Sequence, residues 1–486
     1  MKKYTKLAST LLASMFVVAG LSSCGGGSGS KDTLEIVYYS AGFNETWINT
    51  LANKFEQTHE GVKVHITASY SSEQIISQHL ASRNNTDDLY ISTGNSWKSN
   101  AATGKFADLT DFLNDEVDGV TVKDKVNDEY ADSFYFTKSD GSKATYRLPF
   151  TSGIGGIFYN KKMFEENGWD TWLKNTYSTN TTGVPETYDQ LIALCDKIIE
   201  KPVAVPGDPD GTAAVKPFIY AGTDTDYFDY TVFDWWGQIA GKEAIKDFLK
   251  YNSPDNFNVT KNETYNALKT ATSKWNNIFG SNTGYYVEGQ NTTTAANAQK
   301  SFVNGYAAMM FNGDWLYNET LNYTQTGTFE NFELGLMKTP VLSEAKAGSE
   351  STSYVIGEDQ YIAIPASSSK KELAQEFIKL MISQEGNEIF INQAHGFLAY
   401  KADYSAMNVE DTYMQRAIAL RSSYDTKFTN FSNDRKFLTN NVDIWSSAAN
   451  RPFLSILNGQ KKLDQAFTDI STYVAANWTT WTNNSK

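Results

Sequence analysis

Short apolar runs and amphipathic stretches alternate in the N-terminal part of the chain. Leu34–Tyr39 is a compact apolar run and residues 62–66 alternate between apolar and polar side chains, so both favour strands. Residues 87–91 favour a third strand. Between these strands, residues 44–58 and 71–82 repeat their apolar side chains with the helical period. This strand–helix alternation predicts a lobe built around a parallel α/β sheet.

A second pattern, further along the chain, combines a helix end, a buried strand and a new helix. Asn304–Gly305 ends the first helix, because glycine accepts the left-handed conformation that follows a helix C-terminus. Tyr306–Phe311 is an unbroken apolar run typical of a strand buried on both faces. After a break at Asn312–Gly313, Asp314 can cap a helix that begins at Trp315. Ligands of open α/β sheets bind beyond the carboxyl ends of the strands, so this turn predicts a ligand site. The alternative is a core strand followed by a buried tryptophan.

The remaining segments add loops, strands and helices. Residues 170–183 and 201–226 are polar and rich in Pro, Gly and Asp, which predicts surface insertions or ligand-selective loops. Tyr354–Ile364 is predicted to be a strand that returns to the first lobe. Helices are predicted over residues 370–382 and 460–475.

Length and charge limit the classes of protein to consider. A chain of 486 residues exceeds the ~250–300 residues at which single cores stop growing, so two or more lobes are expected. The net charge of −14 argues against nucleic acid as a partner and against a polybasic membrane patch. Cys195 lies on the apolar side of the helix predicted over residues 187–200, which predicts core packing and no structural disulfide.

The N-terminus has the pattern of an export signal. Three lysines among the first six residues precede an apolar stretch, Leu7–Gly20, which is too short to span a membrane. The following Leu21–Cys24 resembles the lipobox of bacterial lipoproteins, which implies cleavage before Cys24 and lipid attachment to that cysteine. Removal of residues 1–23 deletes three lysines and no acidic residue, so the net charge changes from −14 to −17. Gly25–Ser30 then forms a flexible spacer. An ordinary signal with an incidental cysteine is the alternative.

Motifs for catalysis and for cofactor binding are not found in the sequence. The four histidines do not form a zinc-protease motif, and no P-loop or nucleophile elbow occurs, so no cofactor is predicted. Aspartates between residues 208 and 229 raise a calcium hypothesis, but their spacing differs from that of an EF-hand, and turns explain them equally well. Carboxylates are plentiful, and no pair has a spacing that indicates a glycosidase.

Several motifs resemble those of bacterial extracellular solute-binding proteins of the maltose-binding type, the receptor subunits of ABC importers. The Gly-x-x-Ala-Met sequence that starts at Gly305, followed by a small-residue turn and Trp315, resembles the ligand-binding segment of that family. Four further segments are similar to family segments: residues 104–110, 146–161, 184–188 and 371–400. The resemblance implies two α/β lobes of the periplasmic-binding-protein type, joined by three crossings, with a ligand cleft between them. It implies a signal peptide over residues 1–23, a lipidated linker over 24–32, a first lobe of 33–150 plus 354–398, and a second lobe of 151–353 plus 399–486.

The same resemblance implies which residues contact the ligand. Trp315 is expected to stack on a sugar ring, with Asp314 beside it. Asn95 and Trp97 follow the third strand, where the charged pair of maltose-type members is missing, so a different sugar or hydrogen-bond pattern is implied. Residues 226–240 form an aromatic-rich helix, and from it Phe233 or Trp235 is expected in the cleft. Residues 440–453 lie where relatives place cleft residues and add three candidates: Trp445, Asn450 and Arg451.

The sequence therefore predicts a monomeric receptor, not an enzyme, that binds a carbohydrate and delivers it to ABC permease subunits. It is expected outside the cytoplasm, at the cell surface or in the periplasm, attached to the membrane only through its lipid. Two alternatives stay open. One is a secreted carbohydrate-active enzyme, and the other is the same receptor fold with a non-sugar solute such as a glycerol phosphate, a polyamine or a metal chelate.

Overall fold

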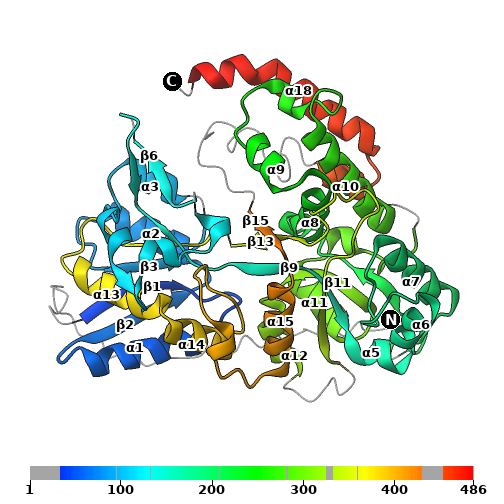
Figure 1. Ribbon diagram of the computed structural model, residues 1–486, viewed down its shortest axis with the longest axis horizontal. Coiled ribbons are helices and arrows are strands. Elements are labelled where there is room, and N and C mark those ends of the chain that lie inside the picture. Colours follow the sequence, from blue (N-terminus) through cyan, green and yellow to red (C-terminus); the bar gives the residue numbers. More distant parts are fainter. Residues whose placement is uncertain are drawn as a thin grey trace, which may run out of the picture. The chain divides into compact units, whose positions relative to one another are not determined.

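The computed structural model of the protein is shown in Figure 1. It describes residues 33–94, 96–131, 133–138, 140–206, 208, 210–280, 283–324, 332–357, 359–429 and 452–484. Five residues singled out by the sequence lie outside this part of the chain: Cys24, Asn95, Trp445, Asn450 and Arg451. The predicted signal peptide and spacer lie outside it as well.

The first lobe is built around a five-stranded sheet with the order β2-β1-β3-β14-β8. Its parallel part confirms the alternation seen in the sequence, since β1 pairs in parallel with both β2 and β3. β14 pairs antiparallel with β3, and β8 pairs antiparallel with β14 at the edge of the sheet. The strands are β1 (Thr33–Tyr39), β2 (Lys63–Ser69), β3 (Leu89–Ser92), β8 (Leu148–Pro149) and β14 (Tyr361–Ala363).

Helices of the first lobe bury their apolar faces against this sheet and against each other (Figure 1). The predicted helices over residues 44–58, 71–82 and 370–382 are confirmed as α1 (Thr46–Thr58), α2 (Ser72–Ala81) and α13 (Lys371–Ile382). The lobe also contains α3 (Ser96–Ala102), α4 (Val122–Lys125) and α14 (Gln384–Ala394). Two small hairpins complete it: β4 (Glu116–Val117) with β5 (Val120–Thr121), and β6 (Tyr135–Thr137) with β7 (Lys143–Thr145).

The second lobe is built around a sheet with the order β10-β11-β9-β13-β15, with β12 also paired to β9. β11 is buried along its whole length, as the apolar run predicted. The predicted break at Asn312–Gly313 is wrong, because both residues continue the ladder with β9 opposite Gly156 and Gly155. The strands are β9 (Gly153–Asn160), β10 (Lys216–Ile219), β11 (Ala307–Gly313), β12 (Leu334–Met337), β13 (Thr352–Ile356) and β15 (Thr426–Phe428).

Residues 354–364 do not form the single strand that the sequence predicts. β13 belongs to the second sheet and β14 to the first, so the chain crosses between the lobes after Ile356 and before Tyr361. Gly357 has a φ of +111°, and a Cβ at that position would lie 2.6 Å from Oγ1 of Thr151. Only glycine fits this crossing, and the change of direction there ends the strand.

Helices of the second lobe pack on its sheet or on one another (Figure 1). α6 corrects the prediction that residues 170–183 are only a surface insertion, because Trp169 and Leu173 bury one face of this helix. Cys195 is fully buried and free, as predicted. The helices are α5 (Lys161–Glu166), α6 (Trp169–Thr176), α7 (Tyr188–Glu200), α8 (Asp229–Ala240), α9 (Lys242–Phe248), α10 (Glu263–Phe279), α11 (Ala295–Val303), α12 (Leu316–Thr324), α15 (Thr412–Ser422), α17 (Pro452–Leu457) and α18 (Leu463–Asn484).

The two lobes have separate hydrophobic cores. One core surrounds the second sheet and two smaller clusters surround the first. Trp315 is half-buried and packs against the second-lobe core and the larger first-lobe cluster. The turn between β11 and α12 is therefore a place where the two lobes meet.

Candidate functional site

Trp315 lies two residues after the end of β11, with its six-membered ring against Gly313, the last residue of that strand. A Cβ on Gly313 would lie 2.4 Å from the indole ring, so glycine is required for the ring to lie this close to the backbone. The rings of Tyr230 and Trp315 form a T-shaped pair with a centroid distance of 5.4 Å and an angle of 78°. Trp315 is thus held by packing on two sides while the residue stays partly exposed, as a stacking platform requires.

Two tyrosines flank Trp315 from the N-terminal end of α8. Tyr227 belongs to the short 3-10 helix Thr225–Phe228, and Tyr230 lies in the first turn of α8. Their ring centroids are 5.1 Å apart. Burial raises the pKa of Tyr227, and the carboxylate of Glu319 raises it further. Trp315, Tyr227 and Tyr230 are called the aromatic cluster below.

The carboxyl ends of the first-lobe strands face this cluster. Tyr39 ends β1, and its register partner Ser69 ends β2, so Tyr70 lies at the same edge with 77% of its surface exposed. Burial raises the pKa of Tyr39, and the charges of Asp359 and Glu319 add to the increase. Glu319 belongs to the second lobe, so its effect on Tyr39 indicates that the two edges lie close together.

Asp314 precedes Trp315 and points into the protein instead of capping α12. Neither of its carboxyl oxygens accepts a hydrogen bond from a described residue, and a Cβ on Gly153 would lie 2.7 Å from Oδ1. Burial raises the pKa of Asp314 to about 7, although Arg421 lowers it in part. The backbone amide of Ile154 also lowers the pKa of Asp314, although it is not placed well enough to form a hydrogen bond with the carboxyl group. The predicted helix cap is therefore wrong, because the side chain turns toward β9.

Substitution of Asp314 by asparagine is expected to change how stability depends on pH. An aspartate has a pKa of about 3.9 when unfolded, so the folded protein holds the extra proton between pH ~4 and ~7. The contribution of Asp314 to stability therefore falls as the pH rises through this window. Between pH 5 and pH 8, the free energy of unfolding of Asp314→Asn relative to the unsubstituted protein should increase by on the order of 2 kcal/mol. Urea unfolding at both pH values measures this difference, and a constant difference would contradict the assignment.

Glu319 is a site residue that the sequence did not single out. Burial raises its pKa to about 7, while the hydrogen bond from Nε2 of Gln299, at 2.5 Å, lowers it in part. Tyr39 was missed in the same way, whereas Tyr227 and Tyr230 lie in the aromatic-rich segment 226–240, from which Phe233 or Trp235 was expected instead. The available signal was the position of Glu319 four residues after Trp315 on a predicted helix, which places both on one face.

Three predicted ligand contacts lie in the core instead. Phe233 and Trp235 are fully buried, and the indole of Trp235 donates to the carbonyl of Pro340 at 3.0 Å. Trp97 has an exposed fraction of 1%, and the guanidinium of Arg147 lies 4.1 Å from its ring centroid. α8 is enclosed by the sheet on one side and α10 on the other, so only its N-terminal aromatics reach the lobe edge.

A buried ion pair connects the lobes near one crossing. Arg421, at the end of α15, pairs with Glu129 of the first lobe through Nη2 and Oε1 at 3.0 Å. The same guanidinium donates from Nη1 to the carbonyl of Ser152 at 2.7 Å, where the chain passes from β8 to β9. Both charged side chains are at most 7% exposed.

A second contact between the lobes lies beside Trp315. Asn318 on α12 donates to the carbonyl oxygens of Gly42, at 2.9 Å, and of Ala394. Oδ1 of Asn318 is hydrogen-bonded to Nδ1 of His395 at 2.6 Å. The helix that follows Trp315 is thereby tied to the first lobe.

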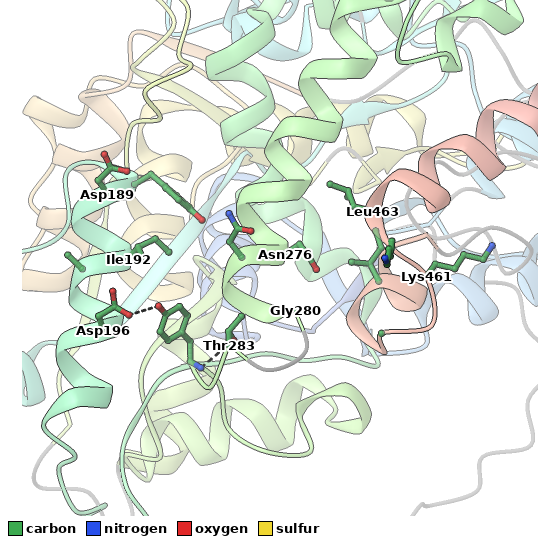
Figure 2. A pocket seen from close by; sticks show the side chains of 15 residues that line it. Asp189, Ile192, Asp196, Asn276, Gly280, Thr283, Lys461 and Leu463 are labelled. Atoms are coloured by element: carbon green, nitrogen blue, oxygen red, sulfur yellow. Dashed lines mark hydrogen bonds between the residues drawn. The ribbon is translucent and has the colours of Figure 1, made fainter.

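A separate hollow of about 990 Å³ lies on the second lobe (Figure 2). Figure 2 shows Asp189 and Asp196 on α7, Asn276 on α10 and Lys461 ahead of α18 around it. Its polar groups are largely paired with protein atoms, since Asp196 accepts from the hydroxyl of Tyr285 at 2.5 Å and Lys461 pairs with Asp469 at 2.5 Å. None of its lining residues has a buried polar atom without a partner. The hollow therefore shows less sign of a ligand than the aromatic cluster.

In the described part of the chain, no three His, Cys, Asp or Glu side chains come together as a metal site would require. None of the described helices combines the length and the apolar character that crossing a membrane needs.

The chain is similar to known proteins in both sequence and fold. The sequence profile of the bacterial extracellular solute-binding proteins matches residues 41–388. No curated protein matches the chain by sequence. The solved structure of the solute-binding protein RafE in complex with raffinose has 18% sequence identity and a TM-score of 0.59, over 91% of this chain and 98% of its own.

Two further solved structures have the same fold. A chitin oligosaccharide binding protein has 19% identity and a TM-score of 0.60, over 92% of this chain and 100% of its own. The GacH receptor of Streptomyces glaucescens, solved unliganded and with acarbose, has 17% identity and a TM-score of 0.64, over 92% of this chain and 97% of its own. At these identities the likeness concerns the two-lobed fold, while the profile match covers most of the sequence. This chain belongs to the family of bacterial extracellular solute-binding proteins.

Proposed function

We propose that this protein is the receptor of an ABC importer and that it binds a carbohydrate between its two lobes. The observation that supports this proposal is the half-buried Trp315 beyond the carboxyl end of a buried strand, in contact with the cores of both lobes. Sugar rings present apolar faces that pack on aromatic side chains, and their hydroxyls need polar partners at the rim. Tyr39, Tyr70, Glu319 and Asp359 supply such partners at the facing edges.

The similar structures agree with a sugar as the ligand. The ligands of those proteins are raffinose, a chitin oligosaccharide and acarbose, all of which are oligosaccharides or close analogues. Proteins of this family are extracellular, so the ligand is captured outside the cytoplasm. We infer that a bound sugar stabilises the closed arrangement of the lobes, which then docks on the permease. We infer also that Cys24 carries the lipid anchor, which mass measurement of the protein from its native membrane would reveal.

Binding without turnover is the expected result of a ligand screen. The purified protein would be tested by thermal shift and then by calorimetry with raffinose, a chitin oligosaccharide and acarbose, and with glycerol phosphate and putrescine as non-sugar solutes. At least one oligosaccharide should bind with a stoichiometry near one, and the sugar should be recovered uncleaved. Stabilisation by a non-sugar solute alone would contradict the carbohydrate assignment, and the appearance of cleaved sugar would favour an enzyme.

A further inference from the structure

Glu319 is a carboxyl group placed beside the stacking platform. Its backbone N–H donates to the carbonyl of Trp315 at 3.2 Å, so the two residues lie one helical turn apart. Trp315 is the residue that precedes α12, and Glu319 lies in the first turn of this helix. The phenol of Tyr227 interacts with both Trp315 and Glu319, so the carboxyl group of Glu319 lies beside the aromatic cluster.

One oxygen of this carboxyl group has no partner among the residues that the structure describes. Oε2 accepts the hydrogen bond from Gln299 on α11. Oε1 accepts no hydrogen bond from a described residue. It is not fully shielded from solvent, so a ligand hydroxyl can reach it. Glu319 also forms no ion pair with a described lysine or arginine, and burial is the main influence on its proton affinity. A half-buried carboxyl with one open oxygen faces the phenols of Tyr39 and Tyr227.

We propose that Glu319 binds the carbohydrate by accepting hydrogen bonds from its hydroxyls as a carboxylate, so that sugar binding releases a proton. This inference rests on the proposed function, because it concerns the same site. A carboxylate accepts hydrogen bonds roughly twice as strong as those of a neutral group, so the sugar favours the ionised form. With a pKa of about 7, Glu319 is about half protonated in the free protein at neutral pH. Affinity should then be highest above pH 7 and fall by up to about tenfold per pH unit below it.

Other titratable groups around α12 must be separated from Glu319. Asp314, ahead of the helix, also has a pKa of about 7, and burial lowers the pKa of His395, which faces α12 from the end of α14. Burial raises the pKa of the two phenols above the range of interest. The further charged groups near these residues are Asp224 beside Tyr227, Asp359 beside Tyr39, Asp411 bonded to Tyr317, and Arg416 and Arg421 on α15.

Calorimetry with raffinose tests the proposal, because raffinose has no titrating group of its own. Binding at pH 7 would be measured in two buffers of different ionisation enthalpy, and affinities would be compared between pH 5.5 and pH 8.5. The unsubstituted protein should release part of a proton and bind at least tenfold more tightly at the higher pH. Glu319→Gln should bind without proton release and with little pH dependence. His395→Asn is the matched control, since asparagine accepts the left-handed backbone at this position, and it should keep the proton release.

The possible results separate this proposal from the proposed function. If raffinose does not bind, the same experiment is run with the chitin oligosaccharide, and failure of every sugar contradicts the function itself. Sugar binding with no proton release, with proton uptake, or with the same pH profile in Glu319→Gln would overturn the role of Glu319 alone. If Glu319→Gln does not fold, Gln299→Met serves instead. Loss of the Gln299 donor should raise the pKa of Glu319 and move the midpoint of the affinity profile to higher pH, and an unchanged midpoint would overturn the proposal.

Discussion

Trp315→Ala is expected to weaken sugar binding by about 30-fold, which corresponds to about 2 kcal/mol, while the protein stays folded. The loss has two sources: the apolar ring face that the sugar covers and the specific aromatic contact. Trp315 is half-buried and lies at the edge of two cores instead of inside one. Removal of its side chain therefore leaves a groove that water can fill, and not a closed cavity. Trp315→Phe should retain a large part of the affinity, because a smaller ring still offers a stacking face.

Calorimetry with the sugar that binds most tightly measures this effect. Trp172→Ala is a matched control, because Trp172 is also half-buried but packs against Tyr177 and Lys197 on the second lobe, away from the aromatic cluster. It should lose some stability and keep its affinity. Equal affinities of Trp315→Ala and the unsubstituted protein would exclude Trp315 from the site.

Arg421→Met is expected to lower the free energy of unfolding by about 3–5 kcal/mol. The substitution leaves Glu129 as a buried carboxylate whose remaining described donor is the hydroxyl of Ser152, at 2.8 Å. It also removes the hydrogen bond to the carbonyl of Ser152 at the β8–β9 crossing. Because an unpaired buried charge is more costly than the loss of the pair as a whole, the double variant Arg421→Met with Glu129→Gln should recover part of the loss.

Arg416 on the same helix provides the control for this prediction. It pairs with Glu333 at 3.3 Å, but both side chains are more than one-third exposed, so water screens the pair. Arg416→Met should cost less than about 1 kcal/mol. Guanidinium unfolding of the four proteins would decide the question, and a cost for Arg421→Met no greater than that for Arg416→Met would mean that the buried pair does not stabilise the folded state.

The local pattern of apolar residues predicted an element correctly where that element buries one face, as α1 and α2 do, or both faces, as β11 does. α1 and α2 begin and end within two residues of their predicted limits, because their apolar residues repeat with the helical period. β11 was found from its apolar run, although it extends to Gly313 because the ladder with β9 continues there. Residues 354–364 were read as one strand, because nothing in a local pattern shows that β13 and β14 pair with different sheets.

The sequence predicted Trp315, the central residue of the candidate site, but not the residues that surround it. Trp315 could be found because strand, turn and helix start are adjacent in the chain. Phe233, Trp235 and Trp97 are aromatics of the same kind, but the elements around them close over their rings. Aromatic composition cannot distinguish a core ring from a ligand platform, because both are large apolar side chains and differ only in what covers them.

The sequence by itself determined that this protein has two α/β lobes, and it determined which strand end carries a tryptophan. The tertiary structure alone decided which side chains share the space around that tryptophan. Tyr39, Tyr230 and Glu319 come from three distant parts of the chain, and the pairing of the sheets and the crossings brings them together. The physical reason is that the packing of whole lobes, and not the local sequence, decides which side chains are buried and which remote segments meet. The raised pKa of Glu319 follows from that burial.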